Sequence, residues 1–159
     1  MGYTHYWNQT RDFKQHEWAM IRIAIDELTK NASVLDKDPK SDQCLSIKDN
    51  NIFFNGIGED GHETFVVPRL KPAIAEWDKE GQAKNVSFEF CKTARKYYDD
   101  YVCASLIIIA HLAPGVLLIS SDGEKDDWVE GLKKAKKILP NVQMFKFKHE
   151  EYDDWKKAI

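Results

Sequence analysis

The segment whose residue types are best suited to binding a ligand is CKTARK, residues 91–96. We expect it to lie where a strand passes into a helix over 94–113. Free backbone N–H groups at a helix start attract anions, and cationic side chains beside them add to that attraction. Lys92 and Arg95 would then pair with a phosphate, while Thr93 would cap the helix or donate its hydroxyl to the ligand. The segment predicts a site for a small anionic ligand.

A solvated basic turn is the alternative for this segment, with Asp99 and Asp100 as counter-charges. Polar residues at the ends of other expected strands would extend the ligand site if those ends converge. An aromatic ring near the start of the chain would stack on a base, although such rings more often belong to a core. The full predicted ligand-binding set is His5, Tyr6, Trp7, Asn55, His62, Lys92, Thr93, Arg95, Ser121 and Asp122.

The stretch GIGEDG, residues 56–61, matches the spacing GxGxxG of dinucleotide-binding loops. In such loops a helix follows the glycines and holds the pyrophosphate at its N-terminus. Here residues 62–68 read as a strand, and Glu59 and Asp60 would repel a phosphate. We therefore interpret the glycines as a hairpin turn.

Three catalytic or metal sites are weaker candidates. His5 and His62 with a carboxylate could hold zinc or manganese, although hydrogen-bonded histidines at sheet ends are the simpler interpretation. Cys91 could be a nucleophile in a basic environment, but a strand cysteine is more often a packing residue. Ser121 and Asp122 with a histidine lack the GxSxG elbow of serine hydrolases. No metal or cofactor is predicted.

The elements that must position these residues alternate irregularly along the chain. Residues 86–93 alternate in the manner of a half-buried strand, with Val86, Phe88 and Phe90 on one side. Consecutive strands in the middle predict an α+β fold in one domain over 1–159, with a mixed or antiparallel sheet and helices mainly on one face. The expected strands are 3–7, 44–47, 52–55, 62–68, 86–93, 116–119 and 142–147; the expected helices are 13–30, 73–81, 94–113, 126–139 and a polar arm at about 148–159.

Composition excludes several classes of protein. A net charge of -3 argues against general nucleic-acid binding, which needs a surplus of Lys and Arg. The three cysteines form no CxxC pair, so a reducing, cytoplasmic location is expected. The longest apolar stretch, 102–112, is too short to span a bilayer, so no membrane association is expected.

Four segments carry a resemblance to a known family. These are MGYTHYW at 1–7, FNGIGEDGHETF at 54–65, FCKTARK at 90–96 and SSDG at 120–123. Together they resemble a family of small uncharacterised proteins of bacteriophages and bacteria. The resemblance implies a phage-related intracellular protein, located inside the host cell if phage-encoded, and it implies no particular catalysis.

Three functions remain open from the sequence. The leading hypothesis is a phage-related binding protein for a small anionic ligand, such as a nucleotide or a nucleotide-derived signal, that counters host defence. The second is a hydrolase or transferase acting on phosphorylated substrates, with His5 or His62 as general acid or base. The third is an inhibitor that binds a host protein through aromatic residues of the tail, Tyr152 and Trp155.

Overall fold

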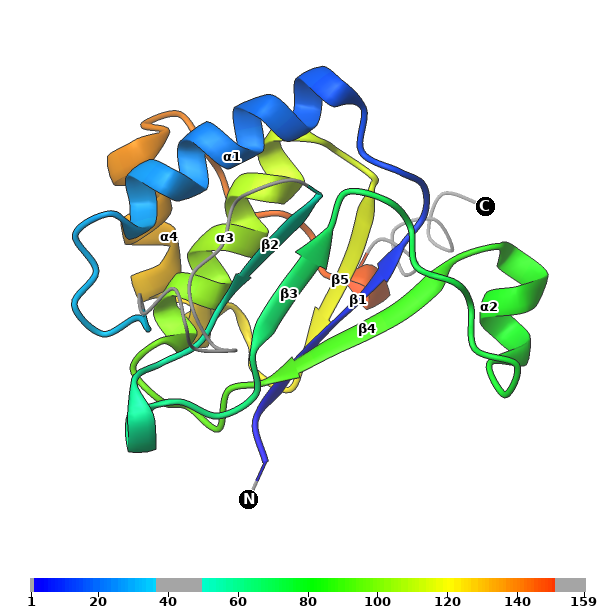
Figure 1. The fold of residues 1–159 in the computed structure, drawn as a ribbon, viewed down its shortest axis with the longest axis horizontal. Coiled ribbons are helices and arrows are strands. Elements are labelled where there is room, and N and C mark those ends of the chain that lie inside the picture. Colours follow the sequence, from blue (N-terminus) through cyan, green and yellow to red (C-terminus); the bar gives the residue numbers. More distant parts are fainter. Residues whose placement is uncertain (1, 37–49, 151–159) are drawn as a thin grey trace.

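Three antiparallel strands form the central sheet, in the order β4-β1-β5 (Figure 1). The structure is a computed structural model that describes residues 2–36 and 50–150. β1 (Thr4–Gln9) lies between β4 (Ser87–Lys92) and β5 (Leu117–Ser121) and runs antiparallel to both. β4 and β5 are therefore parallel to each other and are connected through α3 (Asp99–Leu112), so they form a βαβ unit split by β1.

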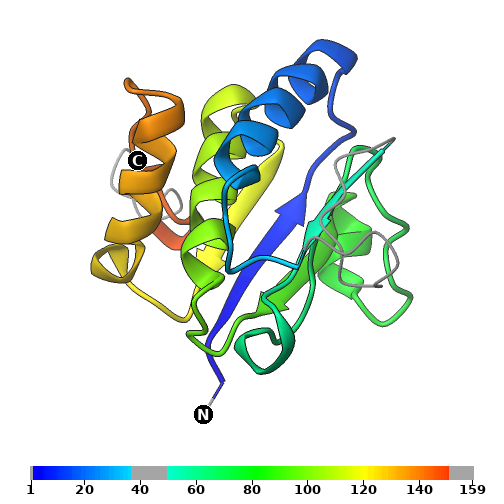
Figure 2. The same ribbon diagram turned by 60° about the vertical axis from the view of Figure 1, so that its left-hand side comes forward.

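The three longest helices of the described residues cover one face of this sheet (Figure 2). α1 (Gln15–Thr29), α3 and α4 (Val129–Ile138) pack together there, with the short 3-10 helix η2 (Lys125–Trp128) leading into α4. α3 is buried continuously over residues 102–109, as its apolar sequence predicts for a central helix. The α+β class and the placement of helices on one face are as predicted. No helix within the described residues is long and apolar enough to cross a membrane.

A separate hairpin of two strands carries the glycine-rich segment. β2 (Asn51–Phe54) and β3 (Phe65–Pro68) pair antiparallel, and the 3-10 helix η1 (Gly58–Asp60) lies in the loop between them. Gly56 packs against the backbone of Asp60 so closely that a Cβ would overlap it. The hairpin interpretation of this segment is confirmed, although its second strand begins at Phe65 rather than at residue 62.

On β4 the large aromatic residues face outward and smaller residues face the core, the reverse of what hydrophobicity alone predicts. The alternation is as expected, but Ser87 and Cys91 point into the core while Phe88 and Phe90 are 40% and 52% exposed. The outer face of the sheet therefore presents aromatic side chains that no large helix covers. This face includes Tyr6, whose ring stacks against that of Phe88 with centroids 6.1 Å apart.

Two predictions of secondary structure are wrong. The helix expected over 94–113 begins only at Asp99, because residues 94 and 95 have left-handed backbone conformations that no helix accommodates. Residues 142–147 form no strand: they follow Pro140 as an irregular segment whose ends, Val142 and Phe147, are buried.

Other differences are shifts of element boundaries. The short helix expected over 73–81 is α2 (Lys79–Lys84). Of the expected C-terminal arm, residues 148–150 are helical and the remainder lies outside the described residues, as does the expected strand 44–47.

Candidate functional site

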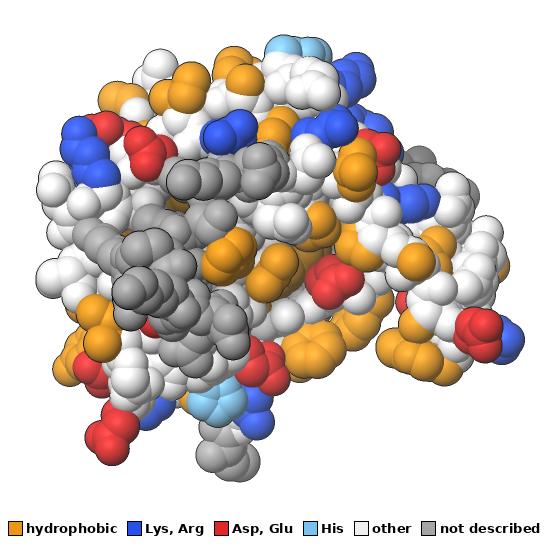
Figure 3. All heavy atoms as spheres, in the orientation of Figure 1, with side chains coloured by type: hydrophobic (Ala, Val, Ile, Leu, Met, Phe, Trp, Pro, Cys, Tyr) orange, Lys and Arg blue, Asp and Glu red, His pale blue; other side chains and the backbone are white. Residues whose placement is uncertain are grey.

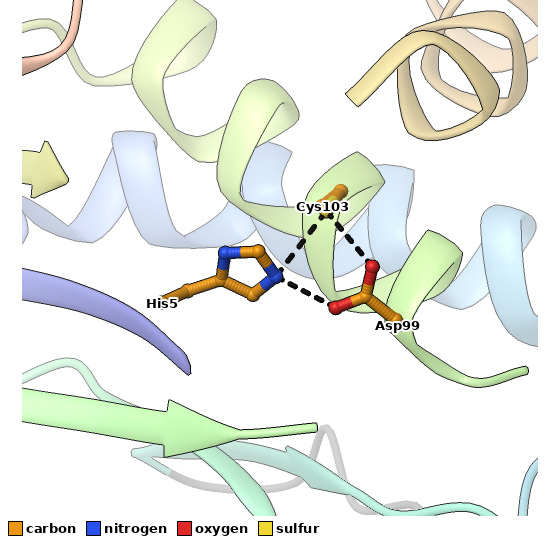
Figure 4. A group of neighbouring side chains, drawn as sticks. All are labelled: His5, Asp99 and Cys103. Carbon is orange, nitrogen blue, oxygen red and sulfur yellow. Dashed lines mark hydrogen bonds and ion pairs between the residues drawn. The ribbon is translucent and has the colours of Figure 1, made fainter. Parts of the chain in front are cut away.

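Five polar side chains from distant parts of the chain converge at one end of the sheet, on its helix-covered face. We call this group the His5 cluster; it comprises His5, Thr93, Asp99, Cys103 and Ser121. His5 comes from β1 and Ser121 from the paired position on β5, while Asp99 and Cys103 occupy successive turns of α3. Figure 4 shows the His5 ring directed at Asp99 and Cys103. Sheet pairing and helix packing together therefore build the cluster.

The His5 imidazole bridges two oxygen atoms. Its Nε2 lies 2.6 Å from Asp99 Oδ1, and its Nδ1 lies 2.8 Å from Ser121 Oγ. The ring is fully buried and Asp99 is nearly so, whereas Ser121 is partly exposed. A carboxylate accepts hydrogen bonds, so Nε2 carries the proton and Nδ1 of the neutral ring is free to accept from the Ser121 hydroxyl.

Asp99 is held by further donors. Thr93 donates its hydroxyl to Oδ1, and the Cys103 thiol, 3.7 Å from Oδ2, donates to the second oxygen. Buried carboxylates are costly unless their lone pairs are satisfied in this way. These hydrogen bonds hold the Asp99 side chain in place next to His5, which fixes the orientation of the imidazole.

Aromatic rings close the cluster from two sides. Tyr3 and Trp128 present edges to the His5 ring at centroid distances of 5.1 and 4.8 Å. The Tyr3 hydroxyl is buried, has no hydrogen-bond partner among the residues that the structure describes, and lies against Gly123, where a Cβ would overlap it. Burial, with the nearby charge of Asp99, raises the pKa of Tyr3, so its hydroxyl remains a donor beside the Ser121 turn.

The two described cysteines are protonated at neutral pH. Burial raises the pKa of Cys103 well above its usual value, and the charge of Asp99 adds to the effect. Burial also raises the pKa of Cys91 to about 12, with a smaller contribution from Glu63. Neither thiol is an activated nucleophile, since reactive cysteines have lowered pKa values.

His5, Asp99 and Cys103 have the chemistry of zinc ligands, with donor atoms within 4.8 Å of one another. The 2.6 Å between Nε2 and Oδ1 is a hydrogen-bond distance, shorter than the ~3.3 Å that separates two N or O ligands of a tetrahedral ion. As arranged, the group is a hydrogen-bonded network rather than an ion cage. The weaker candidate, a metal site shared by His5 and His62, is not formed, because His62 is exposed and its Nδ1 contacts the carbonyl of Lys92.

The basic segment does not form the expected anion site at a helix start. Thr93 turns inward to Asp99, and Lys92 is the last residue of β4. Arg95 stacks on the Tyr3 ring at 3.9 Å from its centroid and pairs with Asp127 at 3.1 Å. The helix begins at Asp99, and the N–H groups of Thr93, Ala94 and Lys96 bond to carbonyl groups instead of being free at a helix start.

Three other predicted ligand residues have structural partners. Asn55 is fully buried and clamps the hairpin loop: its Oδ1 accepts from the N–H groups of Gly56 and His62, and its Nδ2 donates to the His62 carbonyl. Trp7 belongs to the core. Asp122 accepts from the Thr4 N–H and from the Tyr6 hydroxyl.

Of the predicted ligand-binding residues, His5, Thr93 and Ser121 therefore lie together. Asn55, His62, Trp7 and Tyr6 lie outside this cluster. Sequence reasoning missed Asp99 and Cys103 as members of the site and treated Asp99 only as a counter-charge. Their spacing of four residues places both on one face of a helix, which was the available signal. Comparison with family models, with curated proteins and with solved structures gives no match.

Proposed function

We propose that this protein is a hydrolase or transferase in which Ser121 is the nucleophile and His5 its general base. One observation carries the proposal: a partly exposed serine hydroxyl lies 2.8 Å from Nδ1 of a buried imidazole whose Nε2 is bound to Asp99. A hydroxyl, a base and a carboxylate that orients the base form the set by which serine is activated in unrelated folds.

The two ring nitrogens have exchanged roles relative to the familiar triad, in which Nε2 faces the serine. Either nitrogen of imidazole can act as the base, since the carboxylate on the other nitrogen fixes the tautomer. Here Asp99 accepts from Nε2, so the lone pair of Nδ1 faces Ser121.

The reaction would proceed through a covalent intermediate. Ser121 Oγ bonds to the electrophilic carbon as its proton moves to His5 Nδ1, and Asp99 stabilises the resulting imidazolium. His5 then returns this proton to the departing group. In the second step water, or another acceptor in a transferase, donates a proton to Nδ1 and displaces the serine, which regains its hydrogen.

Two donors lie close to Ser121. The Gly123 N–H donates to Ser121 Oγ at 2.9 Å, and the Tyr3 hydroxyl, which has no hydrogen-bond partner among the described residues, packs against Gly123. Donors already in position for an oxyanion are a major source of rate acceleration. Tyr3 would therefore stabilise the tetrahedral intermediate.

Local charge favours a neutral acyl substrate, an ester or thioester, over a phosphorylated one. Arg95 is already paired with Asp127. The turn after Ser121 is acidic and would repel phosphate; its charged residues are Asp122, Glu124, Lys125, Asp126 and Asp127. Binding of a small anionic ligand, the phage relationship and inhibition of a host protein remain predictions from the sequence, and the expected helix start that motivated the first of these is not formed.

A fluorophosphonate reagent tests the proposal directly, because it forms a covalent adduct with an activated serine and releases fluoride. Intact-mass measurement should show one adduct on the wild-type protein, and peptide mapping should place it at Ser121. Ser121→Ala should abolish labelling. His5→Gln and Asp99→Asn should slow it by about 100-fold or more, as expected for loss of a general base.

Ser120→Ala is the matched control, since this neighbouring hydroxyl lies on the opposite face of the sheet. Circular dichroism of each variant separates loss of activation from loss of folding. A folded wild-type protein that takes up no reagent, or labelling that persists in Ser121→Ala, contradicts the proposal. Hydrolysis of p-nitrophenyl acetate but not p-nitrophenyl phosphate would support the acyl substrate class, and the reverse result would overturn that assignment.

A further inference from the structure

A pocket of about 260 Å³ lies on the outer face of the sheet, opposite the His5 cluster. Its floor is formed by β1, β4 and β5, and its wall by α2 and the residues before it. In Figure 3 hydrophobic side chains gather over β4 and on the α2 arm. The lining residues that matter are Tyr6, Asn8, Trp77, Phe88, Ser120 and Lys148.

Three aromatic side chains line this pocket. Tyr6 and Phe88 form a stacked pair with an interplanar angle of 24°, and Trp77 in the opposing wall is 74% exposed. Large exposed aromatic side chains on a sheet are unusual in a surface with no binding role. Rings of this kind bind planar ligands by stacking, and nucleobases are bound in this way.

The charged residues that line the pocket are Asp78, Glu80, Lys84 and Lys148. Asp78 accepts from the Gly81 N–H at the start of α2. Lys148 Nζ donates to the neutral Asn8 Oδ1 at 3.0 Å and has no ion-pair partner within the described residues. Lys84 differs, because it is paired with Glu80 at 2.6 Å. Ser120, opposite Tyr6 in the strand register, adds a hydroxyl for the edge of a ligand.

The size of the pocket restricts the ligand further. Small-molecule sites usually range from about 300 to 1,000 Å³, so this pocket suits a ligand no larger than one nucleotide, held with part of its surface open to solvent. Lys148 is the lining cation that no carboxylate of the described residues holds in an ion pair, so a single phosphate group is the anion that it would bind. We infer that the outer pocket binds a nucleoside monophosphate, with the base between the Tyr6–Phe88 pair and Trp77 and the phosphate at Lys148.

This inference does not rest on the proposed reaction, because the sheet separates the pocket from Ser121. It concerns a mononucleotide and not a nucleic acid, in keeping with the net charge of -3. A base alone would lose the contact with Lys148, and a sugar phosphate alone would lose the stacking.

Isothermal titration with the four 5′-ribonucleoside monophosphates tests the inference, together with adenosine and ribose 5-phosphate as probes for each half. At least one monophosphate should bind with a Kd below about 1 mM, and both half-probes should bind more weakly. Phe88→Ala should weaken binding by about tenfold, the effect of losing one stacking ring. Lys148→Met should remove most of the difference between AMP and adenosine.

Phe90→Ala is the matched control, since Phe90 lies on the same strand and face but outside the pocket lining. Its binding should stay within about twofold of wild type. Ser121→Ala should also bind normally, so failure of one proposal is distinguishable from failure of the other. The inference is overturned if no monophosphate binds at about 5 mM, if Phe88→Ala binds as wild type does, or if Phe90→Ala weakens binding as much as Phe88→Ala does.

Discussion

Ala94 and Arg95 adopt left-handed conformations, with φ of 52° and 58°, between β4 and α3. The N–H groups of Thr93 and Ala94 both bond to the Tyr3 carbonyl, and Thr93 turns its hydroxyl inward to Asp99. Two successive strained residues persist only where the surroundings enforce them, and such strain is common at functional sites. Here the strained turn places Thr93 against Asp99 and Arg95 over Tyr3.

Replacing Ala94 with glycine should therefore stabilise the protein. Glycine adopts this conformation without a Cβ clash, and the gain should be about 0.5–1 kcal/mol in the free energy of unfolding after the entropic cost of glycine. Urea denaturation measures the change. Ala83→Gly, in the exposed α2, is the control and should destabilise by up to about 1 kcal/mol; a similar loss in Ala94→Gly would contradict the prediction.

For single residues, the sequence indicates which side chains are candidates for chemistry better than it indicates which side chains they contact. His5, Thr93 and Ser121 could be selected because polar residues at strand ends are candidates for chemistry. Their partner Asp99 could not, since His5 and Asp99 are 94 residues apart and only the packing of α3 on the sheet joins them. Asn55 shows the opposite error, because a buried amide that clamps a loop resembles a ligand residue in sequence.

The start of α1 shows how one helix depends on a charged side chain. Glu17 is buried, accepts from the two terminal guanidinium nitrogens of Arg11 and from the N–H of Lys14, and so caps the helix. These contacts, with Arg11 the largest, lower the pKa of Glu17 to about 2 from its usual 4.5. A lowered pKa in the folded state means that the stabilisation is complete above pH 4.5 and is lost as pH falls towards 2.

Glu17→Gln should destabilise the protein by roughly 1–2 kcal/mol at pH 7, a range reduced because Arg11 is partly exposed to screening. The difference from wild type should shrink between pH 4.5 and 2, where the native carboxylate becomes protonated. Urea denaturation at several pH values tests this. Glu27→Gln, which removes an exposed pair with Lys30 on the same helix, should show almost no such dependence; a constant difference for Glu17→Gln across this range would refute the explanation.

Elements were predictable where hydrophobic periodicity dominates, as in α1, α3 and α4. Helices and strands were not predictable where backbone geometry or tertiary packing overrides hydrophobic periodicity. The apolar face of β4 was ambiguous because Phe88 and Phe90 are exposed while Ser87 and Cys91 are buried. The alternation of residues 142–147 indicated a strand. The segment instead packs its aromatic side chains against Trp128 and pairs with no strand of the described residues.

That C-terminal segment contributes to the molecule as a whole. Phe145 and Phe147 pack edge-on against Trp128, which in turn contacts His5. One hydrophobic cluster includes Trp128, Val142 and Phe147 together with the helices and the sheet. The segment therefore supports the Trp128 wall of the His5 cluster, although it belongs to no regular element.

Phe147→Ala should lower the free energy of unfolding by about 3 kcal/mol, the cost of removing a buried aromatic side chain. It should also reduce fluorophosphonate labelling of Ser121, because Trp128 loses a ring that packs against it and Trp128 in turn contacts His5. Gln143→Ala, an exposed position in the same segment, should change stability by less than about 0.5 kcal/mol. Equal stability of Phe147→Ala and wild type would show that the segment does not pack on the core.

The central position of β1 has a consequence for how this chain acquires its structure. His5 meets Ser121 across 116 residues, and β1 precedes both of its partner strands. During synthesis an aromatic, β-prone strand must therefore wait without its neighbours until β4 and β5 leave the ribosome. Such distant pairings slow folding, and an unpaired strand edge is prone to aggregation in the meantime. The yield of native protein in the cell will depend on the rate of translation and on chaperones that shield this strand.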